Sequence, residues 1–412
     1  MNIQIKLEYY PIIKEASLRD AINIIEANKK NWDSPFFIDT KSYVKLDEIQ
    51  EIINNLEVKN IKNVIVLGTG GSIQTLLALK HLAKKNIFPI TNSRAIELKD
   101  CLSKTKSNDS IVIPISRAGE TLDINSTIGI FLKNGYKFLG LSSTGVMYNI
   151  LKKINCPILD VPDLAGRFAG SISNVGIVPA YISGVNVDKF LKGLEDGYKL
   201  FMNFKNNEAI TFSTFMFKLY NLGYRIVFSM PYSKSLEGSV GLFVQEVSES
   251  TGKEGKGLIG AYQEAPLCQH SILEFLLGGS KGVVIPLLWT IEKEFDDLTL
   301  ESSIDYVNGQ SAQTIVNYQA DATYQALIEQ KVPSAKIKVI TPDEYTIGNL
   351  ISFIQSSIYY LCLLLNVNWA NNPKVVIGKK ICNEALIKKV PTNEREEIRK
   401  KIATDVFKDF WK

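Results

Sequence analysis

The stretch Asn63-Val-Ile-Val-Leu-Gly-Thr-Gly-Gly-Ser72 decides the fold, because it joins a short apolar run to a glycine-rich loop and a helical pattern. The run of β-branched residues predicts a strand buried on both faces of a parallel sheet. Glycines let the backbone approach a ligand, and the helix that follows offers free N–H groups to an anion. We interpret the loop as a phosphate site; the alternative is a plain strand-to-helix turn.

Two nucleotide-binding motifs fit this loop less well. A dinucleotide-binding Gly-x-Gly-x-x-Gly pattern would place its last glycine at position 73, where the chain has isoleucine. A P-loop would continue with Gly-Lys-Ser or Gly-Lys-Thr, which does not follow.

The order of strand, loop and helix recurs along the whole chain. Six apolar runs predict strands, at residues 63–67, 110–115, 137–141, 225–228, 282–287 and 336–340. Helical patterns alternate with them, at residues 73–85, 122–133, 309–330 and 345–365. This alternation is typical of doubly wound sheets. The sequence therefore predicts an α/β fold of two doubly wound parallel-sheet units packed together, with helical N- and C-terminal extensions.

The same pattern gives provisional domain boundaries. We expect an N-terminal arm over residues 1–44, a first unit over 45–190, a second unit over 191–380 and a C-terminal helical tail over 381–412. No linker rich in proline, glycine and serine separates the two units, so we expect them to pack closely.

Composition limits the classes of partner. The 47 basic and 43 acidic residues nearly cancel, which argues against a nucleic-acid partner. The five scattered cysteines contain no Cys-x-x-Cys pair, so they indicate neither a zinc site nor a disulfide framework. The longest apolar run, residues 358–365, is shorter than the ~18 residues of a membrane span, and the N-terminus lacks the apolar core of a signal peptide. We expect a cytoplasmic protein.

A second candidate phosphate loop follows the next predicted strand. Ser116-Arg117-Ala118-Gly119-Glu120-Thr121 combines two hydroxyl groups, a glycine and a cation, all of which suit a phosphate. Loops at adjacent strand ends face the same crevice of an open α/β sheet. The pair of loops therefore predicts one shared phosphate site.

Together the two loops resemble the phosphosugar-binding loops of the sugar isomerase domain superfamily. Four further segments, in the same order along the chain, are similar to those of the aldose–ketose isomerases of that superfamily. They are Gly166-Arg167-Phe168, the segment Gln245-Glu-Val-Ser-Glu-Ser-Thr-Gly-Lys253, Gln269-His270 and Val375-Val-Ile-Gly-Lys379. The segment that begins at Gln245 is the most specific of these.

The resemblance implies a reaction and a role for each residue. It implies reversible isomerisation of glucose 6-phosphate to fructose 6-phosphate through a cis-enediolate, with neither metal nor cofactor. Glu249 would be the base, Arg167 would stabilise the enediolate, and His270 would open the ring with help from Lys379. Gln245 would hold sugar hydroxyls. The phosphate would be bound by Gly71, Ser72, Ser116, Arg117 and Thr121. The enzyme would be a homodimer in which the histidine enters the partner's site.

The residues alone leave alternatives open. Gln245 and Glu249 share a helix face opposite the apolar stripe of Leu236, Val240 and Val247, so periodicity predicts that both are solvated. Arg117 stands where the superfamily usually has lysine, and Ala118 where it has a hydroxyl residue. A dual glucose/mannose phosphate isomerase, a catalytically silent phosphosugar sensor and a nucleotide-binding oxidoreductase are the alternative functions.

Overall fold

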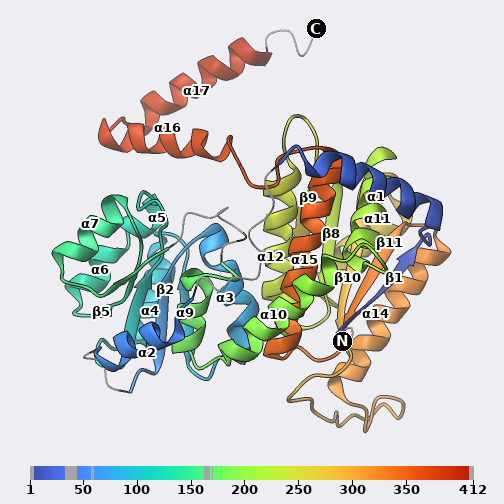
Figure 1. Ribbon diagram of the computed structural model, residues 1–412, viewed down its shortest axis with the longest axis horizontal. Coiled ribbons are helices and arrows are strands. Elements are labelled where there is room, and N and C mark those ends of the chain that lie inside the picture. The colour runs from blue at the N-terminus through green and yellow to red at the C-terminus, as the bar shows by residue number, and fades with distance from the viewer. Residues whose placement is uncertain (1–3, 33–43, 57–59, 162–167, 169, 408–412) are drawn as a thin grey trace. The chain divides into compact units, whose positions relative to one another are not determined.

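The computed structural model describes residues 4–32, 44–56, 60–161, 168 and 170–407 (Figure 1). Met1–Asn371 form one compact unit, and Asn372–Lys412 form a second. The first unit contains two main β-sheets with helices on both faces. The predicted α/β fold with parallel sheets is confirmed.

The first main sheet has the strand order β3-β2-β4-β5, and all its neighbouring strands are parallel. Its strands are β2 (Asn63–Leu67), β3 (Asn86–Ile90), β4 (Ser110–Pro114) and β5 (Lys137–Phe138). A short parallel pair, β6 (Gly140–Leu141) and β7 (Ile158–Leu159), continues from it through a bridge between Ile115 and Leu141. The helices of this region are α2 (Leu46–Asn54), α3 (Gln74–Leu79), α4 (Ala95–Lys104), α5 (Leu122–Asn125), α6 (Ile128–Lys133), α7 (Gly145–Lys153) and α9 (Asn174–Ile182).

The second main sheet has the order β1-β11-β10-β8-β9. Its parallel strands are β8 (Ile226–Pro231), β9 (Ile259–Tyr262), β10 (Val284–Ile291) and β11 (Ser334–Val339). The N-terminal strand β1 (Ile5–Tyr10) pairs antiparallel with β11, with Ile5 opposite Val339. The helices of this region are α1 (Glu15–Lys29), α10 (Val187–Phe201), α11 (Glu208–Asn221), α12 (Lys234–Thr251), α13 (Gln269–Gly278), α14 (Ala312–Glu329) and α15 (Glu344–Leu365).

Alternate residues of the central strands point into different cores. In β2, Val64 and Val66 join the largest core, while Ile65 and Leu67 face a separate core on the other side of the sheet. In β10, Leu287 joins that same largest core and Leu288 faces a third one. The two sheets therefore share one central core, which agrees with the absence of a linker between them.

Helix α15 is the longest element of this central core. By length and composition it could cross a membrane, but the corresponding part of the helix is entirely buried in the structure. Asp343 caps its N-terminus, accepting a hydrogen bond from the Thr346 amide at 2.8 Å, and Asn366 caps its C-terminus in a left-handed conformation. Its apolar composition is that of a helix covered on all sides by protein.

The second unit contains two helices, α16 (Val375–Ile387) and α17 (Thr392–Phe407). No side chain of α16 is buried.

The structure also corrects the expected elements. The helix expected at 122–133 is divided into α5 and α6, with Ser126 and Thr127 between them. Strands β1, β3, β7 and β9 were not expected. All four lie at the edge of a sheet.

Candidate active site

The first predicted phosphate loop lies at the carboxyl end of β2. Gly70–Ser72 form a single 3-10 turn that leads into α3, and Gly70 has a φ of +57°. This left-handed conformation is easily adopted only by glycine, which explains the residue at this position. Gly71 and Ser72 are partly exposed, so the turn is open to a ligand.

The second loop lies beside the first, since β2 and β4 are neighbouring parallel strands. The Ser116 and Thr121 hydroxyl oxygens are 3.0 Å apart, so the two hydroxyls converge on one point. Gly119 has a φ of +69°, and a β-carbon there would lie 2.1 Å from the Thr144 carbonyl oxygen. Arg117 extends from the loop with an exposed side chain. The arrangement presents hydroxyl groups and a cation at one edge of the sheet.

Helix α12 brings Gln245 and Glu249 to the first loop. Gln245 Nε2 donates a hydrogen bond to Glu249 Oε1 at 3.2 Å. A β-carbon on Gly70 would lie 3.2 Å from the same Gln245 nitrogen, so the glycine makes room for this side chain. Gln245 and Glu249 are both partly buried rather than solvated. A carboxylate is thereby held next to a phosphate-type loop.

The face of α12 that periodicity predicted to be solvated is covered by α3. A β-carbon on Gly238 would lie 2.1 Å from the Leu77 carbonyl oxygen, so only glycine allows this close approach. Gly241 lies one turn further along the same face, with the Gln74 side chain near it. The prediction that this face is solvated is therefore wrong. The glycines at 238 and 241, in line with Gln245, are the sequence signal for a packed face.

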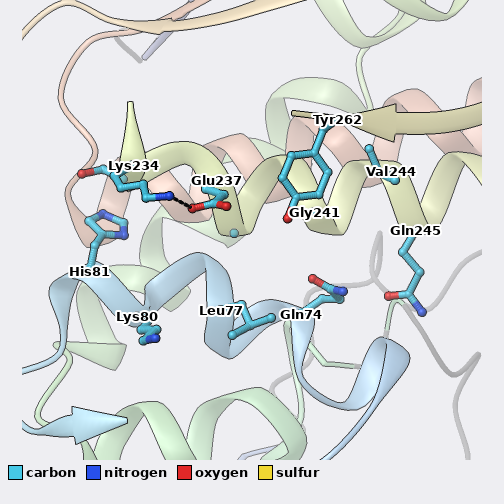
Figure 2. Close-up of a pocket in the computed structure, with 12 residues that line it drawn as sticks. Gln74, Leu77, Lys80, His81, Lys234, Glu237, Gly241, Val244, Gln245 and Tyr262 are labelled. Atoms are coloured by element: carbon cyan, nitrogen blue, oxygen red, sulfur yellow. Dashed lines mark ion pairs between the residues drawn. The ribbon is translucent and has the colours of Figure 1, made fainter. Parts of the chain in front are cut away.

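A cavity of about 660 Å³ extends along α3 and α12 from Gln245 (Figure 2). Its far end is charged. Lys234 forms ion pairs with Glu237, at 3.0 Å, and with Glu264. Hydrogen bonds to Glu264 and Glu237 raise the pKa of Lys234. Tyr262, at the end of β9, also lines the cavity. Sequence reasoning did not identify this cavity, whose residues come from three separate segments.

His270 lies near the opposite end of α12 from Glu249 in the same chain. Gly260 lies beside the middle of α12, since a β-carbon there would be 2.9 Å from the Val244 Cα. Four residues later, Glu264 forms an ion pair with Lys234 at the start of α12. From Gly260 onward the chain therefore runs back along α12, away from Glu249. Lys234 and Glu249 are separated by roughly 22 Å of helix axis, at ~1.5 Å per residue. His270 follows Glu264 by only six residues, and its side chain is exposed.

Two predicted residues, Lys379 and Arg167, lie outside the described part of the first unit. Lys379 lies on α16 in the second unit, and its side chain is exposed there. Arg167 lies outside the residues that the structure describes, although Phe168 directly after it is fully buried. Within the first unit, the structure thus brings together Gly71, Ser72, Gln245 and Glu249, with the Ser116–Thr121 loop at the adjacent strand.

Known proteins resemble this chain in sequence and in fold. No protein-family model matches it. It is 27% identical over 338 residues to the glucose-6-phosphate isomerase of Methanocaldococcus jannaschii. The aligned region covers 78% of this chain and 83% of that protein. A glucose-6-phosphate isomerase structure from Chlamydia trachomatis superposes with a TM-score of 0.79 at 16% identity, covering 98% of this chain and 92% of that one. A hypothetical protein from Thermus thermophilus superposes with a TM-score of 0.82 at 18% identity, covering 92% and 100%.

Proposed function

Because this chain is homologous to the glucose-6-phosphate isomerases over most of its length, we propose that it interconverts glucose 6-phosphate and fructose 6-phosphate in the cytoplasm. One observation carries the proposal: the Gln245–Glu249 pair on α12 lies against the first glycine-rich loop. An aldose–ketose isomerase needs a base beside a bound phosphosugar, and a carboxylate next to a glycine-rich loop supports this assignment.

Glu249 is the base in this proposal. Its carboxylate takes the proton from C2 of the open-chain aldose and returns it to C1, through a cis-enediolate. The hydrogen bond from Gln245 fixes the orientation of the carboxylate. Gln245 also holds sugar hydroxyls. Arg167, assigned by its place in the sequence, stabilises the negative charge of the enediolate.

The phosphate is bound by the two loops. The Gly71 and Ser72 turn supplies backbone N–H groups and a hydroxyl, and the neighbouring loop supplies Ser116, Thr121 and the Arg117 guanidinium. Charge-assisted hydrogen bonds to phosphate oxygens are stronger than neutral ones, and an arginine guanidinium can form two of them at once. Anchoring the phosphate places C1 and C2 at a fixed distance from the loops.

Ring opening requires a second chain. Within one chain His270 lies near the far end of α12 from Glu249, so we assign ring opening to His270 of the partner subunit in a twofold homodimer. Such a closed dimer is the commonest soluble assembly. Lys379 assists the histidine.

A coupled assay tests the proposal directly. Purified protein is incubated with fructose 6-phosphate, and glucose 6-phosphate is detected through its oxidation by an added dehydrogenase. We expect turnover at 1–10³ s⁻¹, about the range of ordinary enzymes. Mannose 6-phosphate in place of fructose 6-phosphate distinguishes a dual-specificity enzyme. A protein that binds phosphosugars without converting them would contradict the proposal.

A further inference from the structure

A fully buried polar network lies directly behind the candidate site. Glu246 is adjacent to Gln245 on α12 but points inward, and it is 0% exposed. Gln355 on α15 donates from Nε2 to Glu246 Oε1 at 3.0 Å and to Ser171 Oγ at 2.8 Å. Its Oε1 accepts a hydrogen bond from the Tyr198 hydroxyl on α10. Burial, with the nearby Glu246 charge, raises the pKa of Tyr198, so this hydroxyl remains a donor.

The network reaches the first phosphate loop through the segment around Ser171. The Ser171 hydroxyl donates to the Phe168 carbonyl oxygen at 3.2 Å. Gly170 lies against the loop so closely that a β-carbon there would be 2.9 Å from the Gly71 carbonyl oxygen and from Thr75 Oγ1. Phe168, Gly170 and Ser171 therefore form a support beneath the loop, and we call them the loop support.

We propose that Gln355 is a positioning residue that fixes the distance between the phosphate loop and the base-bearing helix. It is bonded to α12 through Glu246 and to the loop support through Ser171, so one amide group connects the two halves of the site. This inference rests on the proposed function. It adds a residue that touches neither the sugar nor its phosphate.

The amide group suits this role for a chemical reason. Gln355 donates through its nitrogen to a carboxylate and a hydroxyl, and accepts through its oxygen from Tyr198. Leucine has a similar volume but can do neither, and glutamate in its charged form cannot donate. A buried polar group that loses its hydrogen-bond partner destabilises the folded state. The neighbouring elements are therefore expected to shift after such a substitution.

A shift of this kind affects turnover more than phosphate affinity. The substrate is held at its phosphate and reacts at C1 and C2, so the separation between loop and base controls the attack geometry. A displacement of about 1 Å can reduce the rate ~10²-fold. The phosphate loop itself keeps its own backbone and hydroxyl groups.

The first test compares Gln355→Leu with Tyr360→Phe. Tyr360 is buried on the same helix and donates to the Phe201 carbonyl oxygen at 2.6 Å, but it contacts neither α12 nor the loop support through this bond. Both variants lose buried hydrogen bonding between α15 and α10. We expect Gln355→Leu to lower kcat by about 10- to 100-fold and to leave the Kd for inorganic phosphate within about threefold. Tyr360→Phe should lower Tm and leave kcat within about twofold.

The second test exchanges the two partners. Gln355→Glu alone brings two carboxylates together. Glu246→Gln combined with Gln355→Glu restores a donor facing an acceptor; the new carboxylate still accepts from Tyr198, and the Ser171 hydroxyl can turn to donate to it. We expect the double variant to recover kcat to within about fivefold of wild type, from a loss of more than about 50-fold in Gln355→Glu.

The possible results distinguish a failure of the proposed function from a failure of the role proposed for Gln355. Inactive wild-type protein would overturn the proposed function and this inference with it. Active wild type with equal kcat losses in Gln355→Leu and Tyr360→Phe would overturn the role of Gln355 alone. If Gln355→Leu fails to fold, the double variant Glu246→Gln with Gln355→Glu provides the test. A double variant that folds but has a kcat as low as that of Gln355→Glu would also overturn the role of Gln355.

Discussion

Gln245 Nε2 donates to Glu249 Oε1 at 3.2 Å, one helical turn further along α12, and this bond orients a carboxylate beside a glycine-rich loop. The amide is in turn constrained by Gly70, which has no side chain to displace it. The geometry of this carboxylate therefore depends on contacts between helix α12 and the loop.

The first prediction concerns this carboxylate. Glu249→Gln keeps the size and polarity of the side chain but removes its basicity. Loss of a general base typically costs ~10²–10⁴ in rate, so we expect kcat to fall by that factor while substrate still binds. Glu237→Gln, on the same helix, is the control and should retain turnover within a few-fold. Near wild-type kcat in Glu249→Gln would exclude Glu249 as the base.

The second prediction concerns the paired hydroxyls at 116 and 121. Ser116→Ala and Thr121→Ala each remove one partner of the 3.0 Å contact and one candidate phosphate ligand. We expect a rise in KM of about 10- to 150-fold, since a hydrogen bond to a charged group contributes ~1.5–3 kcal/mol. Ser126→Ala, whose exposed hydroxyl donates to the Asp123 carbonyl oxygen, is the matched control. Equal losses of affinity for phosphorylated and unphosphorylated sugars would contradict a phosphate role.

The third prediction concerns Gly119. Alanine there would combine a positive φ with a β-carbon 2.1 Å from the Thr144 carbonyl oxygen, so the loop must move. We expect a loss of about 1–3 kcal/mol in stability, measured by urea unfolding, together with a higher KM. Gly129→Ala in α6 has open space around it and should change stability by less than about 1 kcal/mol. Similar effects of the two substitutions would show that the contact with Thr144 is unimportant.

The fourth prediction concerns the shared site. Glu249→Ala and His270→Ala proteins are denatured and refolded together. With random pairing about half the dimers are mixed, and each has one site with both residues intact, so roughly a quarter of wild-type activity should return. Each variant refolded alone is the control and should stay inactive. A silent mixture would assign His270 to some other role.

Much of the fold was predictable because the central strands are short runs of β-branched residues. The run at 63–67 matches β2 at both ends. The missed strands have weaker patterns: β3 contains Pro89, and β9 is only Ile259–Tyr262. In the site, the motifs located the loops and Glu249, but periodicity placed Glu249 in solvent because it cannot show that α3 covers α12. Gln355 carried no signal at all, since its partners are more than 100 residues away in sequence.

The pairing of β1 with β11 has a consequence for how the chain is made. Ile5 is synthesised about 330 residues before its partner Val339. At roughly 5–20 residues per second, β11 is synthesised on the order of 15–70 s after β1, and only then can the two strands pair. The sheet that contains β2 and β4 is complete much earlier, because its strands lie within residues 63–138. The strands of that sheet can therefore pair while β1 still lacks its partner β11.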